Sequence, residues 1–164
     1  MKSNTKTIVN AAVLLAIALV FQLVKMGQFF TGTGINTVLL LAASLCGFFW
    51  AAAIGCITPI MAVLLGVHPP VLIPLVPYII AANIVFVLIF WLFSKKNIYV
   101  GAITAAIVKF AFLYLFVNFF AKLIVAKPIP APIKLALSFP QLITALAGGV
   151  LAIIVLKALK KSQV

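Results

Sequence analysis

Long apolar runs, separated by short polar or proline-rich breaks, make up most of the chain. The runs are continuous rather than alternating, and several approach the ~20 residues that a helix needs to cross a bilayer. In lipid every backbone N–H and C=O must be satisfied internally, so continuous runs of this length predict transmembrane helices. The pattern predicts a single transmembrane domain over residues 1–164, with helices at roughly 7–25, 35–46, 51–66, 71–93, 98–121 and 140–159.

The apolar block from Ile35 to Gly66 decides how often the chain crosses the membrane. It is too long for one untilted crossing, and a weak break at 46–50 divides it. Lysines concentrate on the cytoplasmic side of membrane proteins, and only two crossings of this block place both termini and the Lys95–Lys96 pair there together. We therefore predict an all-α membrane protein, a compact bundle of six transmembrane helices with both termini cytoplasmic.

This topology places three longer connections on the outer face, whereas the inner turns are short. They are Gly27–Gly34, Val67–Pro70 and Leu123–Phe139. Loops of this kind often carry binding functions, so the asymmetry suits a protein that captures a molecule from outside. We expect a multi-pass protein of a cell (plasma) membrane, in a bacterium, with the lipid bilayer as its surroundings.

The composition narrows the chemistry. Apolar residues are 67% of the chain and charged residues only 7%, as expected for a protein surrounded by lipid. The charged residues are all lysines, and the chain has no aspartate or glutamate. This excludes a pair of catalytic carboxylates, an acidic cation site and an Asp/Glu proton relay. A glycine-rich phosphate loop followed by lysine is also missing, which excludes nucleotide hydrolysis by that route.

The remaining signals for other chemistries are weak. Cys46 and Cys56 lie in apolar segments without a CxxC pair or clustered histidines, and we interpret them as packing residues. The lysines lie at helix ends and in loops rather than on one face with aromatic residues, so nucleic acid is not an expected partner. We predict that the protein is not an enzyme and has no catalytic residues, no cofactor and no metal site.

Short motifs along the chain give a more specific indication. Their order, together with the size and the six-helix plan, resembles the substrate-binding S components of energy-coupling factor (ECF) vitamin transporters, particularly the riboflavin-transporter-like branch. The motifs are the AVLLA stretch 12–16, the glycine-rich segment after it, Thr58-Pro59, Leu64-Leu65-Gly66, Pro69-Pro70, Asn83 in the middle of a proline-led helix, and the lysine-rich stretch 153–161.

The resemblance implies a substrate-binding subunit of an ATP-driven importer, which captures a small water-soluble vitamin or related micronutrient from the outside. It also implies a membrane coupling protein and two cytoplasmic ATPases as partners. The alternative is a solitary small permease or channel that acts as a homo-oligomer. An acidic residue that the riboflavin branch can carry near the start of helix two is replaced here by Asn36-Thr37, which argues against riboflavin itself.

Ala12 and Ala16 match the Ala-x-x-x-Ala motif with which this family contacts its coupling protein. Small residues four apart lie on one face of a helix and let another helix approach closely. The same spacing is common in membrane helices that have no such partner. The two alanines are therefore candidate partner-contact residues.

Lys109 is predicted near the middle of the membrane, about twelve residues into the fifth helix, where a lysine costs on the order of 3 kcal/mol. It must reach water, bond to carbonyl groups, or meet an anionic ligand or a partner's carboxylate, unless it snorkels to the interface. Tyr114 and Asn118 share one face of this helix, whereas Lys109 and Asn118 point in opposite directions. We expect Tyr114 and Asn118 to form the pocket wall and Lys109 to face the coupling partner.

Other polar and aromatic residues complete the predicted site. Asn83 would contact the ligand or bond to another helix, and Gln141 would contact the ligand or satisfy the first turn of the last helix. Phe30 and Tyr78 are candidates for stacking on a flat ring. The predicted ligand-binding residues are Phe30, Asn36, Tyr78, Asn83, Tyr114, Asn118 and Gln141, with Lys109 as a possible anion or partner contact.

Overall fold

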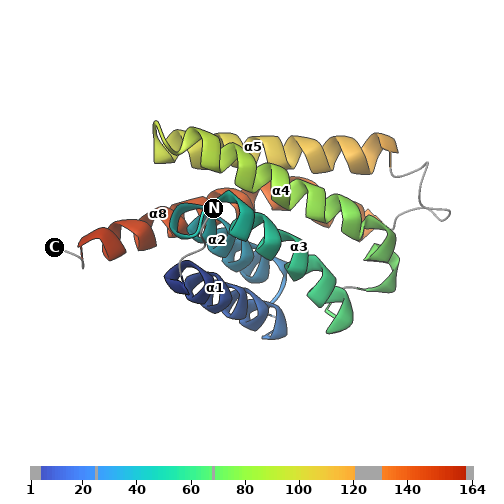
Figure 1. Ribbon diagram of the computed structural model, residues 1–164. Helices are drawn as coiled ribbons and strands as arrows, with labels where there is room; N and C mark the ends of the chain where they lie inside the picture. Colours follow the sequence, from blue (N-terminus) through green and yellow to red (C-terminus); the bar gives the residue numbers. More distant parts are fainter. Residues whose placement is uncertain (1–4, 25, 68, 121–130, 162–164) are drawn as a thin grey trace.

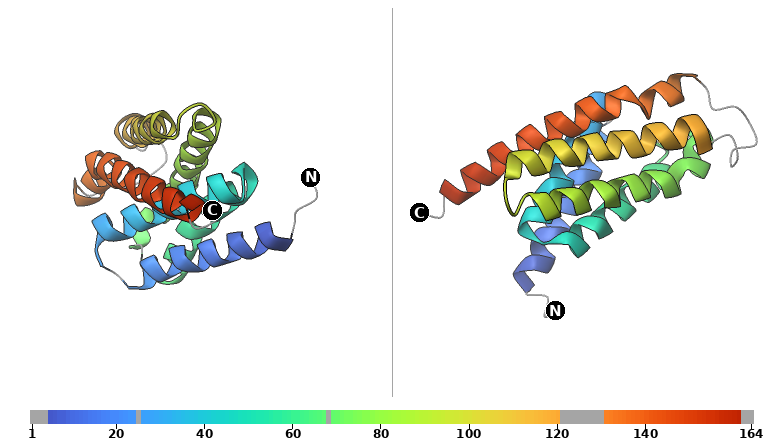
Figure 2. Two further views of the ribbon diagram at one scale, coloured as in Figure 1. Left: turned by 90° about the vertical axis from the view of Figure 1, so that its left-hand side faces the viewer. Right: turned by 90° about the horizontal axis from the view of Figure 1, so that it is seen from above.

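The computed structural model describes residues 5–24, 26–67, 69–120 and 131–161, and within them the chain is a bundle of helices without strands (Figures 1 and 2). Successive long helices run in opposite directions along the bundle. The elements are α1 (Thr5–Leu23), α2 (Gln28–Leu45), α3 (Phe48–Leu64), the 3-10 helix η1 (Pro70–Leu75), α4 (Val76–Phe93), α5 (Ile98–Leu115), the π-helical turn η2 (Phe116–Phe120), α7 (Ala131–Ala136) and α8 (Phe139–Lys161).

The predicted all-α membrane bundle is confirmed. Among the described residues, five segments are long and apolar enough to cross a membrane, and α3 is a sixth apolar helix of 17 residues. The long apolar block does divide in two, because α2 ends at Leu45 and α3 begins at Phe48. Gly47 joins them with φ 89°, a backbone conformation that residues with a side chain rarely adopt.

Two of the three expected outer loops differ from the prediction. Residues 28–34 are the first two turns of α2, and 131–136 form α7, whereas 121–130 lie outside the described residues. The glycines of the first segment serve helix packing. A Cβ added to Gly34 would lie 2.6 Å from the Phe21 ring of α1, so the absence of a side chain lets the two helices approach.

Other helix boundaries shift at the same end of the bundle. The segment expected to begin a helix at residue 71 starts as η1, and α4 begins at Val76 with Pro77 in its first turn, a position where proline fits a helix. The fifth helix leaves regular α geometry after Leu115 and continues as the π-helical turn to Phe120.

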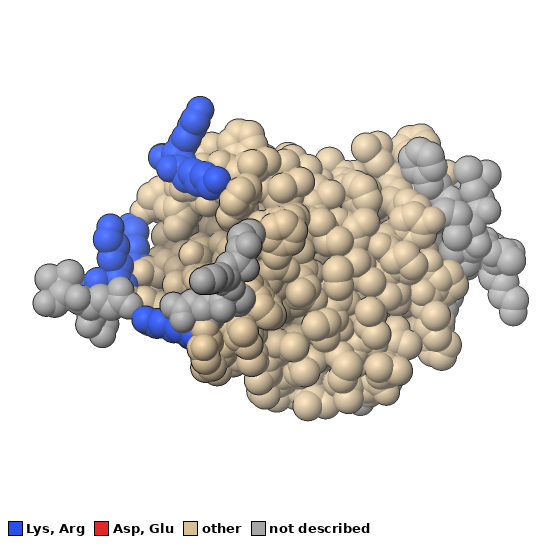
Figure 3. All heavy atoms as spheres, viewed as in Figure 1, with Lys and Arg blue, Asp and Glu red and all other residues tan. Residues whose placement is uncertain are grey.

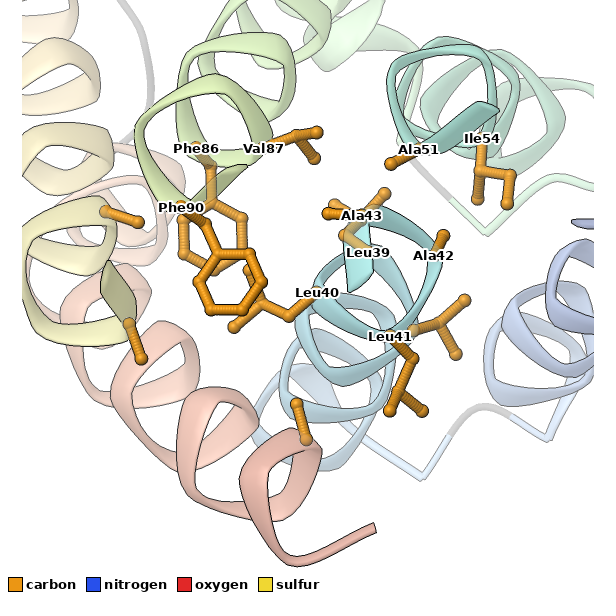
Figure 4. Packing of buried hydrophobic residues seen from close by; sticks show 14 of the residues in the cluster. Leu39, Leu40, Leu41, Ala42, Ala43, Ala51, Ile54, Phe86, Val87 and Phe90 are labelled. Atoms are coloured by element: carbon orange, nitrogen blue, oxygen red, sulfur yellow. The ribbon is translucent and has the colours of Figure 1, made fainter. Parts of the chain in front are cut away.

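Helix α2 lies at the centre of the bundle, where it packs against α1, α3, α4 and α8. Leu39 and Leu40 of α2 and Phe86 and Phe90 of α4 are fully buried between these helices (Figure 4). Close packing is possible at α8 because Gly148 has no side chain, and a Cβ there would lie 2.7 Å from the Cβ of Asn36. Small residues of this kind bring membrane helices together, since lipid supplies no hydrophobic force between them.

Exposed lysines gather at one end of the bundle, which we call the lysine-rich end (Figure 3). Lys157 of α8 donates a hydrogen bond to the hydroxyl of Tyr99 at the start of α5, which places the end of α8 beside the turn between α4 and α5. This clustering agrees with the expected cytoplasmic side. The lysine-rich end comprises Lys95, Lys96, Lys157, Lys160 and Lys161. The predicted topology places Lys25, Lys122, Lys127 and Lys134 on the outer side. Lys134 lies in α7, and the other three are outside the described residues.

Candidate functional site

The end of the bundle opposite the lysine-rich end contains a cavity of about 550 Å³. This volume is in the range of small-molecule sites in proteins. Its walls come from the end of α1, the start of α2, the end of α3, the first half of α4, the second half of α5, α7 and the start of α8. The polar lining residues are Gln22, Gln28, Thr31, Asn36, Thr58, Asn83, Lys109 and Gln141, and apolar ones include Ile35, Ala62, Leu72, Ile79 and Leu113.

Lys109 of α5 is the charged residue of this cavity and is only 4% exposed. Its Nζ donates hydrogen bonds to Oδ1 of Asn36 at 2.7 Å and to Oδ1 of Asn83 at 2.8 Å. Both asparagines are buried and line the cavity themselves. Three helices, α2, α4 and α5, thus meet at one ammonium group.

Backbone acceptors fix the direction of this hydrogen-bond network. Nδ2 of Asn83 donates to the carbonyl of Gly55 at 3.1 Å, so its Oδ1 is the atom left for Lys109. The hydroxyl of Thr144 donates to the carbonyl of Gln141 and can therefore accept from Nδ2 of Asn36 at 3.4 Å. The two asparagines hold Lys109 in place, and each is bonded to a further helix, Asn36 to α8 and Asn83 to α3.

The bond between Asn83 and Gly55 follows from a proline in α3. Pro59 has no N–H, so the carbonyl of Gly55, four residues earlier, lacks its usual helical partner. Asn83 of α4 supplies the missing donor. Gly55 also makes room for it, because an added Cβ would lie 3.2 Å from the Cβ of Asn83. The proline, the glycine and the asparagine are therefore linked, and two of them, Pro59 and Asn83, line the cavity.

Gln22 adds an unsatisfied polar atom to the cavity. Its Nε2 donates to the carbonyl of Thr58 at 2.8 Å, which connects α1 with α3. Its Oε1 is buried and has no hydrogen-bond partner, as is also true, among the described residues, of the hydroxyl oxygen of Thr33. Gln22 is 2% exposed and lines the cavity, whereas Thr33 does not line it.

The structure brings together four of the residues singled out from the sequence. Asn36, Asn83, Gln141 and Lys109 all line the cavity. The expectation that Lys109 faces a coupling partner is wrong, because the ammonium group is enclosed by α2, α4 and α5 and lies away from the outer surface of the bundle. Asn83 forms the interhelical bond that was one of its two expected roles, and it borders the cavity as well.

The other predicted ligand contacts do not line this cavity. Tyr114 of α5 is 45% exposed, and Asn118 of η2 donates to the carbonyl of Tyr114, so these two residues do not form the wall of the cavity. Phe30 is exposed in the first turn of α2. Tyr78 stacks on Phe116 with ring centroids 3.5 Å apart, and its ring face is covered by the protein itself.

The candidate partner-contact residues lie elsewhere. Ala12 and Ala16 are exposed on the outer face of α1. Val9, Val13 and Val20 of the same helix are each more than half exposed, so an apolar strip surrounds the two alanines. The spacing and the exposure leave this face open to lipid or to another membrane helix.

Several residues of the site were not identified from the sequence. Gln22, Thr58 and Thr144 are buried polar residues inside apolar helices, and such residues in membrane helices are frequently functional. A further signal was the spacing of Gly55 and Pro59, which predicts an unpaired carbonyl in α3 and hence a donor from another helix. The sequence does not show which helix supplies that donor.

Comparison with known proteins identifies the family. The model of the family described as "ECF transporter, substrate-specific component" matches residues 6–159, nearly the whole chain. No curated protein and no solved structure matches the chain. The match is to the family as a whole, and the riboflavin-transporter-like branch stays a prediction.

Proposed function

Because this chain belongs to the substrate-specific components of ECF transporters, we propose that its cavity captures a small water-soluble vitamin or related micronutrient from outside the cell. The observation that carries the proposal is the position of the cavity. It lies at the end of the bundle opposite the lysine-rich end, and lysines favour the cytoplasmic side. The cavity therefore faces the outside when the protein has its expected orientation.

The lining of the cavity suits a small polar molecule with an apolar part. Apolar side chains such as Ile35 and Ile79 form much of the wall, and a few fixed polar groups interrupt it. This combination is typical of ligand sites, where apolar contact supplies affinity and a small number of hydrogen bonds supply orientation. The side chain of Gln28, bonded to the carbonyl of Ala136, joins α2 to α7 at the border of the cavity.

Energy for uptake comes, in this proposal, from a membrane coupling protein and two cytoplasmic ATPases that other chains supply. The exposed strip of α1 around Ala12 and Ala16 is the proposed contact with the coupling protein. Leu at either position would hold an approaching helix away, because close approach needs small side chains.

The first experiment is purification of the tagged chain from its native membranes in mild detergent, with identification of the proteins that accompany it. Recovery of a coupling membrane protein and two ATPases is expected. Repeated recovery of the chain alone, or as a homo-oligomer, from membranes that contain those partners would contradict the proposal and favour a solitary permease or channel.

Two variants separate capture from coupling. Ile79→Trp adds bulk to the cavity wall and is expected to abolish retention of the compound that the wild type retains from a mixture of water-soluble vitamins, with the partners still co-purifying. Ala12→Leu together with Ala16→Leu is expected to abolish co-purification of the partners while the compound is still retained. Val150→Leu, at an exposed position of α8 away from the strip and from the cavity, is the control and should change neither property. If the Ile79 variant lost its partners and the alanine variant kept them, the assignment of capture to the cavity and of coupling to α1 would be contradicted.

A further inference from the structure

We propose that the substrate carries an acidic group, most simply a carboxylate, and that Lys109 binds this group inside the cavity. This inference rests on the proposed function, since it names the chemical class of the molecule that the cavity captures. The geometry behind it is a buried ammonium group that borders the cavity and is held by two neutral amide oxygens.

The chain has no side-chain counter-ion for Lys109. It contains no aspartate and no glutamate. No side chain of this protein can therefore offer a carboxylate to a lysine. The partners of Lys109 are the side-chain oxygens of Asn36 and Asn83. Burying a charge without a counter-charge is costly even when hydrogen bonds are present. A negative charge close to Lys109 must come from another molecule.

The cavity is the route by which such a molecule reaches Lys109. The residue is 4% exposed, and the ring of Phe86 lies on another side of it, with Nζ 4.9 Å from the ring centroid. An ammonium group has three donors, and the two asparagines accept from two of them. Among the described residues no acceptor takes the third, which leaves it for an acceptor in the cavity. Asn36 and Asn83 act here as positioning residues, because they fix Nζ.

Gln22 indicates, independently of Lys109, a second chemical group that the ligand carries. Its Oε1 is an acceptor that is buried and unpartnered, while its Nε2 is fixed on the carbonyl of Thr58. A buried acceptor without a donor is unfavourable, so a ligand N–H or O–H at this position would supply the hydrogen bond that Oε1 does not find among the described residues. Together with the apolar walls, this describes an organic acid with an apolar body and a hydrogen-bond donor.

The experiment uses the purified wild-type protein and begins with the dialysable fraction of yeast extract as the probe. Mass spectrometry identifies the compound that the protein retains, and equilibrium dialysis then compares that compound with a derivative that differs only at one group. The expected compound is an acid, and conversion of its carboxylate to the primary amide should weaken binding on the order of 100-fold, as expected for the loss of a buried charge pair.

Variants assign the effect to the residue. Lys109→Gln should weaken binding of the acid on the order of 100-fold. It should also reduce the difference in affinity between the acid and its amide. Gln22→Leu should weaken both forms by about 10-fold, with the preference for the acid retained. Lys134→Gln is the control, because it removes a lysine from α7 that does not line the cavity, and it should leave binding unchanged.

The outcomes separate this inference from the proposed function. A retained compound that is neutral or cationic, or an acid bound as well as its amide by the wild type, overturns the inference and leaves the proposed function standing. The same holds if Lys109→Gln folds and binds the acid with unchanged affinity. A wild type that retains nothing contradicts the proposed function itself. The comparison of acid and amide needs only the wild type, so it tests whether the acidic group contributes to binding even if the Lys109 variant does not fold.

Discussion

Lysines at the two ends of the bundle have very different surroundings. At the lysine-rich end, Lys95 lies over the ring of Trp91 at 3.6 Å, and Lys157 lies beside Tyr99, an exposed residue. These contacts belong to the surface, where water and lipid headgroups can surround the charge. At the cavity end Lys109 is enclosed and is bonded to two asparagines. This difference supports the proposal that lysine serves orientation at one end and ligand recognition at the other.

The backbone differs between the two ends as well. Short turns join α2 to α3 and α4 to α5 at the lysine-rich end. At the cavity end, Pro59 interrupts the hydrogen bonds of α3, η1 precedes α4, and α5 passes into a π-helical turn. Irregular backbone is tolerated at membrane depth where it lines a cavity or is buried in protein. The irregular helices are thus those that surround the candidate site.

Breaking the helix contact behind the cavity should have the largest effect on stability. Gly148→Val would bring a side chain against Asn36 and against the backbone of Thr33 and Thr37, with the nearest atoms 2.7–3.0 Å from the new Cβ. We expect a loss of about 3 kcal/mol, because overpacking there separates α8 from α2. Thermal unfolding in detergent measures it.

Gly149→Ala is the matched control for this change. Its new Cβ would meet two side-chain atoms, the Cβ of Ala102 at 3.1 Å and Cδ1 of Leu40 at 3.9 Å, and no backbone, so a much smaller decrease in melting temperature is expected. Equal melting temperatures for the Gly148 variant and the wild type would show that the close contact of α2 and α8 does not hold this end together.

Removing the connection between α4 and the interrupted helix should have an intermediate effect. Asn83→Leu leaves the carbonyl of Gly55 without a donor and removes one oxygen from Lys109, and we expect a loss of about 2 kcal/mol. Pro59→Ala restores an N–H that can reach Gly55. The loss caused by Asn83→Leu should therefore be smaller by about 1 kcal/mol in that background. Strict additivity of the two substitutions would contradict the pairing of Pro59 with Asn83.

Neutralising lysines at the other end should have the smallest effect. Lys95→Gln together with Lys96→Gln removes two exposed charges, and we expect a change in stability below about 0.5 kcal/mol and unchanged ligand binding. Thermal unfolding and equilibrium dialysis of the same preparation measure both. Ligand affinity reduced as strongly as in Lys109→Gln would remove the distinction between the two ends.

The six-helix plan could be predicted from the sequence because it depends on run length and on the break near Gly47. The interpretation of residues 27–34 as a loop was wrong, since Gly32 and Gly34 mark close helix contacts rather than a turn. The sequence indicated correctly that Tyr114 of α5 and Asn118 of η2 are neighbours one turn apart. It did not show which face of the helix points inward, because packing against α4 and α8 sets that rotation.

The network around Lys109 depends on contacts between residues far apart in the sequence. Asn36 lies 73 residues and Asn83 lies 26 residues from Lys109. Polar residues in apolar helices marked each of the three as a candidate. Their convergence on one ammonium group requires the relative rotation of α2, α4 and α5, which no spacing along the chain determines.

The central claim, that the cavity end faces the outside and the lysine-rich end faces the cytoplasm, is tested most directly by labelling single cysteines in intact cells. In a background with Cys46→Ala and Cys56→Ala, Gln28→Cys places a thiol at the cavity border and Lys96→Cys places one at the other end. A membrane-impermeant maleimide should label position 28 in intact cells and position 96 only after permeabilisation. Labelling of position 96 in intact cells, with position 28 protected, would contradict the account.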